Sequence, residues 1–394
     1  MFILIFSCLF SAFSLQAQND TLSSKAEISL LTSSPGPLLY QAFGHSAIRV
    51  KDPASKLDQV YNYGTFDFNT ENFYWKFARG YLLYSLSIKP FHSYVEEYKF
   101  YNQSIYEQVF NLDHEEKNKL YSFLQENHLP ANRFYLYDYF QDNCATRIYD
   151  ILFRVFAEKV QLDDLGWYQP ASYRESIDPY LRQFPLSHLG IDISLGMPTD
   201  QKMAPEDYMF LPEYLMRGLQ NAIIEQPGFD AKPLVKSYVV LYEGARKFPE
   251  DPPRQWWVFI LLIILFVATF FFTFQEIKKS KIYPVLDISI FGLLGIIGIY
   301  LSFLWIGTQH TAAFVNADLL WATPLHLLVV FYIWRGHYKS SFLFWYFSIF
   351  FLLFLLYLLM WVIDFKNFNW LIVPLLLIYG TRLYRWNFFR PKPE

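Results

Sequence analysis

One cysteine is the first candidate for chemistry in this sequence. Among 394 residues only Cys8 and Cys144 carry thiols. Cys8 lies in the stretch MFILIFSCLFSAFSLQAQ, whose apolar run and small Ala17 are typical of a signal peptide, although a basic start is missing. We expect cleavage near residue 17, with an uncleaved anchor as the alternative. Cys144 is then the only thiol of the exported chain, and it is either reactive or a small buried side chain.

The position of Cys144 favours a nucleophile. It follows Asp142 and Asn143, either of which can cap a helix. The apolar residues after it recur at helical spacing: Ile148, Ile151, Leu152 and Val155. The thiol therefore falls in the first turn of a helix. Free backbone N–H groups and the positive end of the helix dipole stabilise a thiolate there, and they can bind the oxyanion formed when a carbonyl is attacked.

A histidine on a strand can supply the base. His45 follows Gly44 in FGHSAIRV, which alternates as a strand does, and a strand holds such a side chain rigidly. A strand histidine and a helix-start cysteine suffice for acyl transfer if the fold brings them together. The other histidines of this part of the chain are interpreted as structural, with His188 the hardest to dismiss: His92, His114, His128 and His188.

Metal, cofactor and nucleic acid chemistry have little support in the sequence. No paired ligand spacing for zinc, no Gly-rich phosphate loop and no GxSxG element occurs. We therefore expect no cofactor. The net charge of −3, without a basic cluster, gives no indication of nucleic acid binding.

The elements that must position these side chains form an exported domain over residues 18–253. We expect strands over 43–50 and 59–68, paired as a hairpin through KDPASKLD, and helices over 113–130 and from 144 onward. The segment FYWKFARGYLLYSLSI is rich in aromatic residues and is either core or a surface that meets lipid. Strand-like alternation early and helical periodicity later indicate an α+β domain.

The rest of the chain, 254–394, is predicted to be a transmembrane domain that follows the charged, proline-rich segment FPEDPPRQ. Its five apolar segments cover about 256–274, 285–306, 319–335, 342–363 and 370–385. Pro324 and His326 interrupt the third segment. Lysine and arginine concentrate in the first loop, the third loop and the tail. The positive-inside rule places these regions in the cytoplasm and the N-terminal domain outside.

The combination of FGHSAIRV, YNYGTFDF and DNCATR resembles one particular family. A histidine on a strand before a cysteine at a helix start is similar to circularly permuted papain-like domains of the NlpC and lecithin:retinol acyltransferase kind. The whole chain resembles the Lnb-type lipoprotein N-acyltransferases of Gram-negative bacteria. These have a periplasmic domain with such elements followed by a multi-span membrane domain. The resemblance covers signal, domain order and spans.

The resemblance implies an inner-membrane enzyme that takes an acyl chain from a phospholipid and transfers it to a diacylglyceryl lipoprotein. It implies Cys144 as nucleophile and His45 as base, matched position by position. In the wider superfamily the third, orienting group comes from the next strand, which offers Asn62 and, less well, Asp67.

Further polar residues are candidates for binding the substrates. They are Asn143 and Arg147 beside the nucleophile, Arg79 in FYWKFARGYLLYSLSI, and His310 and Asn316 in the outward loop GTQHTAAFVNADLLW. Asp318 in the same loop and His326 within the third span are polar groups at membrane depth.

Two other functions use the same features. A membrane-tethered, NlpC-like cysteine peptidase or amidase acting on the cell wall would share the dyad, but it would need one span and a polar, open cleft. A scaffold or sensor would not need the thiol of Cys144 at all. The sequence leaves the oligomeric state open.

Overall fold

The N-terminal domain is built around an antiparallel sheet. The computed structural model describes residues 21–156, 160–163, 165–225, 231–249, 254–367 and 370–389, so the predicted signal peptide lies outside the described residues. The sheet has seven strands in the order β10-β5-β1-β2-β3-β4-β6. Their bounds are β1 Glu27–Ser33, β2 His45–Asp52, β3 Leu57–Thr65, β4 Leu83–Pro90, β5 Ile105–Phe110, β6 Phe134–Leu136 and β10 Val235–Tyr242. A small sheet joins β7 Val160–Gln161, β8 Ile223–Ile224 and β9 Lys232–Pro233.

The expected hairpin and helices are confirmed. β2 and β3 pair antiparallel, with Ile48 opposite Tyr61 and Asp52 opposite Leu57. The helices of this domain are α1 Phe73–Arg79, α2 Phe91–Phe100, α3 His114–His128, α4 Cys144–Phe156, α5 Tyr173–Leu181, α6 Pro185–Ser194 and α7 Pro212–Gln220. Strands and helices in one domain confirm the α+β class.

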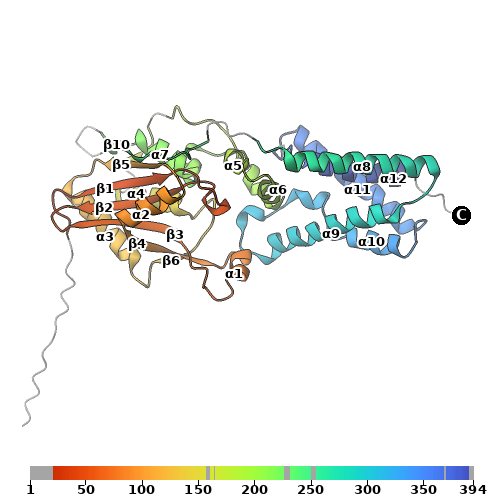
Figure 1. Ribbon diagram of the computed structural model, residues 1–394, viewed down its shortest axis with the longest axis horizontal. Coiled ribbons are helices and arrows are strands. Elements are labelled where there is room, and N and C mark those ends of the chain that lie inside the picture. Colours follow the sequence, from red (N-terminus) through yellow and green to blue (C-terminus); the bar gives the residue numbers. More distant parts are fainter. Residues whose placement is uncertain are drawn as a thin grey trace, which may run out of the picture.

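Helices cover both faces of the sheet (Figure 1). α4 packs against β2 and β3, flanked by α3 and α7, while α2 packs against β3 and β4. On α4 the side chains of Ile148 and Leu152 are fully buried in the larger core. Each such side chain contributes about 1.5–3 kcal/mol of burial free energy. This packing fixes the start of α4 beside the first residue of β2.

The C-terminal domain is helical. α8 Trp257–Lys279, α9 Pro284–Gly307 and α11 Ser341–Val362 are long and apolar enough to cross a membrane. The other two predicted segments give shorter helices, α10 His326–Trp334 and α12 Val373–Phe388. Among the described residues, then, helices form on all five apolar segments, but only three reach the length expected of a full span.

The third predicted span, 319–335, is broken for a physical reason. It begins as the short 3-10 turn η5 Ala317–Leu320 and becomes helical only at His326, after Pro324. Gly298 of α9 lets this break pack closely, because a Cβ there would lie 2.3 Å from the Thr323 carbonyl carbon. The His326 ring bonds the Trp321 carbonyl oxygen at 2.8 Å and the Tyr346 hydroxyl at 2.8 Å. His326 therefore satisfies polar groups that the break leaves free.

Two buried ion pairs lie where the two domains meet. Arg174 of α5 pairs with Asp200 at 2.7 Å, between its Nε and the carboxylate Oδ1. Asn367, after α11, donates its backbone N–H to the same carboxylate oxygen at 3.4 Å. The neighbouring Lys366 lies 3.5 Å from the Asp318 carboxylate, and both side chains are almost fully buried. The membrane domain thus holds the N-terminal domain through desolvated polar contacts.

Candidate functional site

Cys144 is the first residue of α4, and Asn143 caps that helix. The Asn143 Oδ1 accepts hydrogen bonds from the N–H groups of Ala145 at 2.7 Å and Thr146 at 3.0 Å. Its Nδ2 donates to the carbonyl oxygens of Tyr139 and Phe210. Of the two predicted caps, Asn143 is the one that acts. Since its amide is used in the protein, the structure gives it a part in positioning the helix and no free donor for substrate.

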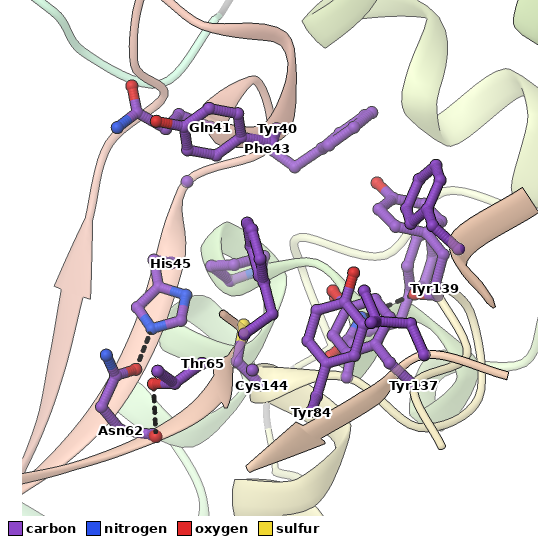
Figure 2. Close-up of a pocket in the computed structure, with 18 of the residues that line it drawn as sticks. Tyr40, Gln41, Phe43, His45, Asn62, Thr65, Tyr84, Tyr137, Tyr139 and Cys144 are labelled. Atoms are coloured by element: carbon purple, nitrogen blue, oxygen red, sulfur yellow. Dashed lines mark hydrogen bonds between the residues drawn. The ribbon is translucent and has the colours of Figure 1, made fainter. Parts of the chain in front are cut away.

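His45 and Cys144 lie beside Gly64, at the irregularity in the β3–β4 pairing between Asn62 and Thr65. Figure 2 shows the two side chains at the same end of the cavity. A Cβ on Gly64 would lie 3.7 Å from the Cys144 Cβ and 3.9 Å from the His45 Cε1. Gly64 has a φ of +85°, which a glycine adopts without strain. The Cys144 side chain is buried, the His45 side chain is partly exposed, and both face the same cavity.

The electrostatics favour a thiolate–imidazolium pair. Burial opposes charge on the sulfur, but the attraction and hydrogen bond of His45 outweigh it, so the pKa of Cys144 is lowered. Backbone N–H groups of Ser46 and Ala145 add to this stabilisation. Burial also opposes the imidazolium, and the same pairing with Cys144, aided by Asn62, raises the pKa of His45 above its ordinary value. Opposite charges that favour each other's charged form shift both pKa values in these directions.

Asn62 of β3 orients the imidazole. Its Oδ1 lies 2.5 Å from the His45 Nε2. Because an amide oxygen only accepts, Nε2 must donate, which leaves Nδ1 to face the thiol. The Tyr98 ring stacks against His45 at a centroid distance of 6.4 Å. The alternative third residue, Asp67, does not fit this place, since its carboxylate accepts from the backbone N–H and side chain of Asn69.

A cavity of about 500 Å³ opens from this triad. Pockets of this size hold small molecules or parts of larger ones. Figure 2 shows Cys144 between His45 on one side and Tyr84 and Tyr137 on the other. The aromatic and apolar lining includes Phe66, Phe68, Phe77, Leu82, Tyr84 and Tyr137, and the polar lining includes Gln41, Thr65, Lys89, Glu97 and Gln103.

The tyrosines of this lining were not singled out from the sequence. Burial raises the pKa of Tyr84 to about 12 and also raises the pKa values of Tyr137 and Tyr139 well above the ordinary value, so all three are neutral phenols. They give the cavity an aromatic wall without charge. The aromatic run YLYDYF shortly before the nucleophile, which contains Tyr137 and Tyr139, was the available signal for two of them.

Three of the predicted binding residues lie at the cavity or beside it, and the helix cap Asn143 is one of the lining residues. His310 lines the cavity, and its Nε2 lies 3.2 Å from the Phe77 carbonyl oxygen. Arg79 ends α1 and donates from Nε to the Gly307 carbonyl oxygen at 3.2 Å. The loop after α9 therefore contributes His310 to the cavity wall.

The other two predicted binding residues lie elsewhere. Arg147 forms a bidentate ion pair with Asp142 and stacks over Tyr135, with its guanidinium 3.9 Å from the ring centre, and it does not line the cavity. Arg147 lies one helical turn past Cys144. Its guanidinium pairs with Asp142 in the loop that precedes the helix. Asn316 is buried, where its Nδ2 donates to the Ile193 carbonyl oxygen at 2.8 Å and its Oδ1 accepts from the Asp318 N–H. Both contacts are structural.

The remaining polar candidates also have protein partners. His188 is buried in α6, with its Nε2 3.2 Å from Asp192 and 3.5 Å from Asp178. Asp318 accepts hydrogen bonds from the Trp321 indole at 2.8 Å and the Tyr357 hydroxyl at 2.5 Å. Within the described ranges, no three histidine, cysteine or acidic side chains gather as a metal site.

Comparison with known protein families matches both parts of the chain. The model of the Lnb N-terminal periplasmic domain matches residues 14–178. The model of the Lnb transmembrane domain matches residues 256–392. No curated protein and no solved structure matches the chain, so the permuted papain-like arrangement of the fold stays a prediction.

Proposed function

The chain belongs to the Lnb family, and on that premise we propose that it is a cysteine-dependent lipoprotein N-acyltransferase. The observation that carries this proposal is the Cys144–His45–Asn62 cluster at a cavity that a loop of the membrane domain helps to line. Nucleophile, base and orienting group are in reach of one another, and the cavity wall is largely aromatic.

In the first half-reaction, Cys144 attacks an ester carbonyl of a membrane phospholipid. The His45 Nδ1 holds the thiol proton, so the sulfur attacks as a thiolate. A C–S bond forms and the ester C–O bond breaks. His45 gives its proton to the departing alkoxide, which leaves as the lysophospholipid. The products are a thioester on Cys144 and a neutral imidazole.

In the second half-reaction, the α-amine of a diacylglyceryl-cysteine lipoprotein attacks the thioester. A C–N bond forms, the C–S bond breaks and the amine proton passes to the Cys144–His45 pair. The lipoprotein leaves with a third, amide-linked acyl chain. The enzyme returns to its starting protonation state, so no cofactor is required.

The start of α4 supplies a donor for the oxyanion of both tetrahedral intermediates. The N–H groups of Ala145, Thr146 and Arg147 are bonded to Asn143. Among the described residues the Cys144 N–H has no acceptor, and it lies at the positive end of the helix. We assign the oxyanion to it, because donors fixed at a helix start stabilise developing negative charge without reorganisation.

The membrane arrangement suits this chemistry. Both substrates are lipids, and the family models together with three span-length helices fit an inner-membrane protein with a periplasmic domain. A multi-pass topology with a cytoplasmic C-terminus, as the loop charges predict, places the cavity on the periplasmic side. A cell-wall peptidase is less consistent with an aromatic cavity shared with a membrane loop.

Mass spectrometry of lipoprotein N-termini tests the proposal. Cells with the intact protein should contain lipoproteins with an amide-linked acyl chain, and cells expressing Cys144→Ala at equal levels should lack it. If lipoproteins in the Cys144→Ala cells were N-acylated to the same degree, the proposed function would be refuted.

A further inference from the structure

Helix α1 and its flanking turns carry large side chains that the protein does not cover. Tyr74 is 80% exposed, Trp75 57% and Phe77 53%. Phe68, before the helix, is 61% exposed and Tyr81, after it, 40%. A cluster of exposed aromatic residues of this kind on one short segment marks an interaction surface. We refer to residues 68–82 as the aromatic segment.

The aromatic segment rests on the end of a membrane helix. The Trp75 ring stacks on Phe303 of α9 at a centroid distance of 5.9 Å. Arg79 bonds the Gly307 carbonyl oxygen, and the Gln309 N–H donates to the Arg79 carbonyl oxygen at 3.0 Å. Gly307 is the last residue of α9, a span-length helix. In Figure 1, α1 accordingly lies beside the end of α9, between the two domains. The segment therefore lies level with the end of this helix, where the surface of a bilayer is expected.

The composition of the aromatic segment is typical of the membrane–water interface. Tryptophan and tyrosine concentrate where hydrocarbon meets headgroups, and a basic side chain there pairs with lipid phosphate. Lys76 and Arg79 supply such charges on the same helix. The Arg79 guanidinium also lies 4.9 Å from the Tyr81 ring centre, a cation–π contact typical of a partly desolvated surface.

The same segment forms part of the cavity wall. Phe77, Gly80 and Leu82 line the cavity together with His310 and Cys144. Gly80 has a φ of +73°, and a Cβ there would lie 3.2 Å from the Gln309 Cβ, so the segment and the membrane loop approach closely at this glycine. One continuous space thus runs from the bilayer-level segment to the nucleophile.

We propose that the aromatic segment is embedded in the outer half of the bilayer interface and that a lipid acyl chain reaches Cys144 through the cavity that this segment lines together with His310. The occupant of the exposed aromatic surface is lipid. The route of entry rests on the proposed function, whereas the depth of the segment in the bilayer does not.

Spin labelling measures the depth directly. In full-length protein with Cys8→Ser and Cys144→Ser, reconstituted in phosphatidylethanolamine–phosphatidylglycerol nanodiscs, a nitroxide is placed at Tyr74→Cys. The control is Tyr238→Cys on β10, an exposed tyrosine on the edge strand far from the helical domain (Figure 1). We expect oxygen to relax the label at 74 more effectively than a water-soluble nickel chelate does, and the reverse at 238. Equal, water-like accessibility at both positions would overturn the proposal.

A charge at the same position tests the route. Tyr74→Glu places a carboxylate in the interface at a side chain that is mostly exposed, and Tyr238→Glu is its control. We expect transfer of an acyl chain from phospholipid to Cys144 to slow about fivefold or more in the first variant only, with alkylation of Cys144 by iodoacetamide unchanged. Equal acylation rates in both variants would reject the route. If the wild-type protein is never acylated while the label at 74 is buried in lipid, the proposed function fails and the embedded segment stands.

Discussion

Replacing Asn62 by alanine removes the acceptor that orients the His45 ring. The Oδ1 of Asn62 lies 2.5 Å from the His45 Nε2 and bonds the imidazolium more strongly than the neutral ring. A hydrogen bond to a charged group contributes about 1.5–3 kcal/mol. Since each 1.36 kcal/mol is a factor of ten, kcat/KM for acyl transfer should fall roughly ten- to 150-fold. Asn62→Asp keeps an acceptor and should retain more activity than Asn62→Ala.

The pH profile of Asn62→Ala separates orientation from general destabilisation. The active pair exists above the pKa of Cys144 and below that of His45, because a thiolate and an imidazolium are both needed. Asn62 helps to raise the pKa of His45, so its loss should move the alkaline limb of the kcat/KM profile to lower pH. The assay is single-turnover acylation of Cys144 in nanodiscs between pH 5 and pH 10. Asn132→Ala, which removes an exposed amide that does not line the cavity, serves as the control. Unchanged rates with an unchanged alkaline limb in Asn62→Ala would refute the assigned role of Asn62.

Three further substitutions test packing and charge. Gly80→Ala should destabilise the protein by about 1–2 kcal/mol more than Gly336→Ala in thermal unfolding, because both have positive φ but only Gly80 meets a neighbouring chain segment. A similar loss of stability in the Gly80→Ala and Gly336→Ala variants would mean that the positive φ alone causes it. Arg147→Ala should change acylation kinetics less than threefold and stability by no more than about 1 kcal/mol, since its ion pair is partly exposed; a large rise in KM would restore a role in lipid binding. Lys366→Met leaves the Asp318 carboxylate buried without its cation and should cost about 3–5 kcal/mol in unfolding, with much of the loss recovered by Asp318→Asn in the same protein. If the effects of Lys366→Met and Asp318→Asn on the free energy of unfolding simply added in the double variant, the two residues would not form a direct pair.

Local signals predicted the elements that carry the chemistry. The polar pair before Cys144 and the apolar spacing after it specify a capped helix, and the structure has that helix with Asn143 as its cap. The alternation around His45 specifies a strand, and β2 begins at that residue. These patterns depend on residues close in sequence, so they can be read without the fold.

Contacts between residues that are far apart in the sequence could not be predicted from such local patterns. The encounter of His45 with Cys144 depends on α4 packing across β2, and it was inferred only through resemblance. The ion pair of Arg147 could not be told from a lipid-binding arginine, because Asp142 lies five residues away in a cap loop whose shape the sequence does not specify. The third span was placed by hydropathy, which registers Pro324 as a weak point but not the tight contact with Gly298 that stabilises the break.

The surroundings of the aromatic segment could not be predicted from the sequence either. Its sequence allowed either a core or a lipid-facing surface. Only the position of Trp75 on Phe303 and of Arg79 on Gly307 distinguishes them, since these contacts place the segment at the end of a membrane helix.

The most direct test of the account is the detection of an acyl group on Cys144. Purified protein in phospholipid nanodiscs, without lipoprotein acceptor, is quenched in acid and its intact mass is measured. We predict an adduct with the mass of a fatty acyl group on the peptide containing Cys144. It should disappear with hydroxylamine or on addition of a diacylglyceryl-cysteine peptide, and it should be absent in Cys144→Ala. Continued N-acylation of the peptide by Cys144→Ala, with no adduct in the wild-type protein, would contradict the account.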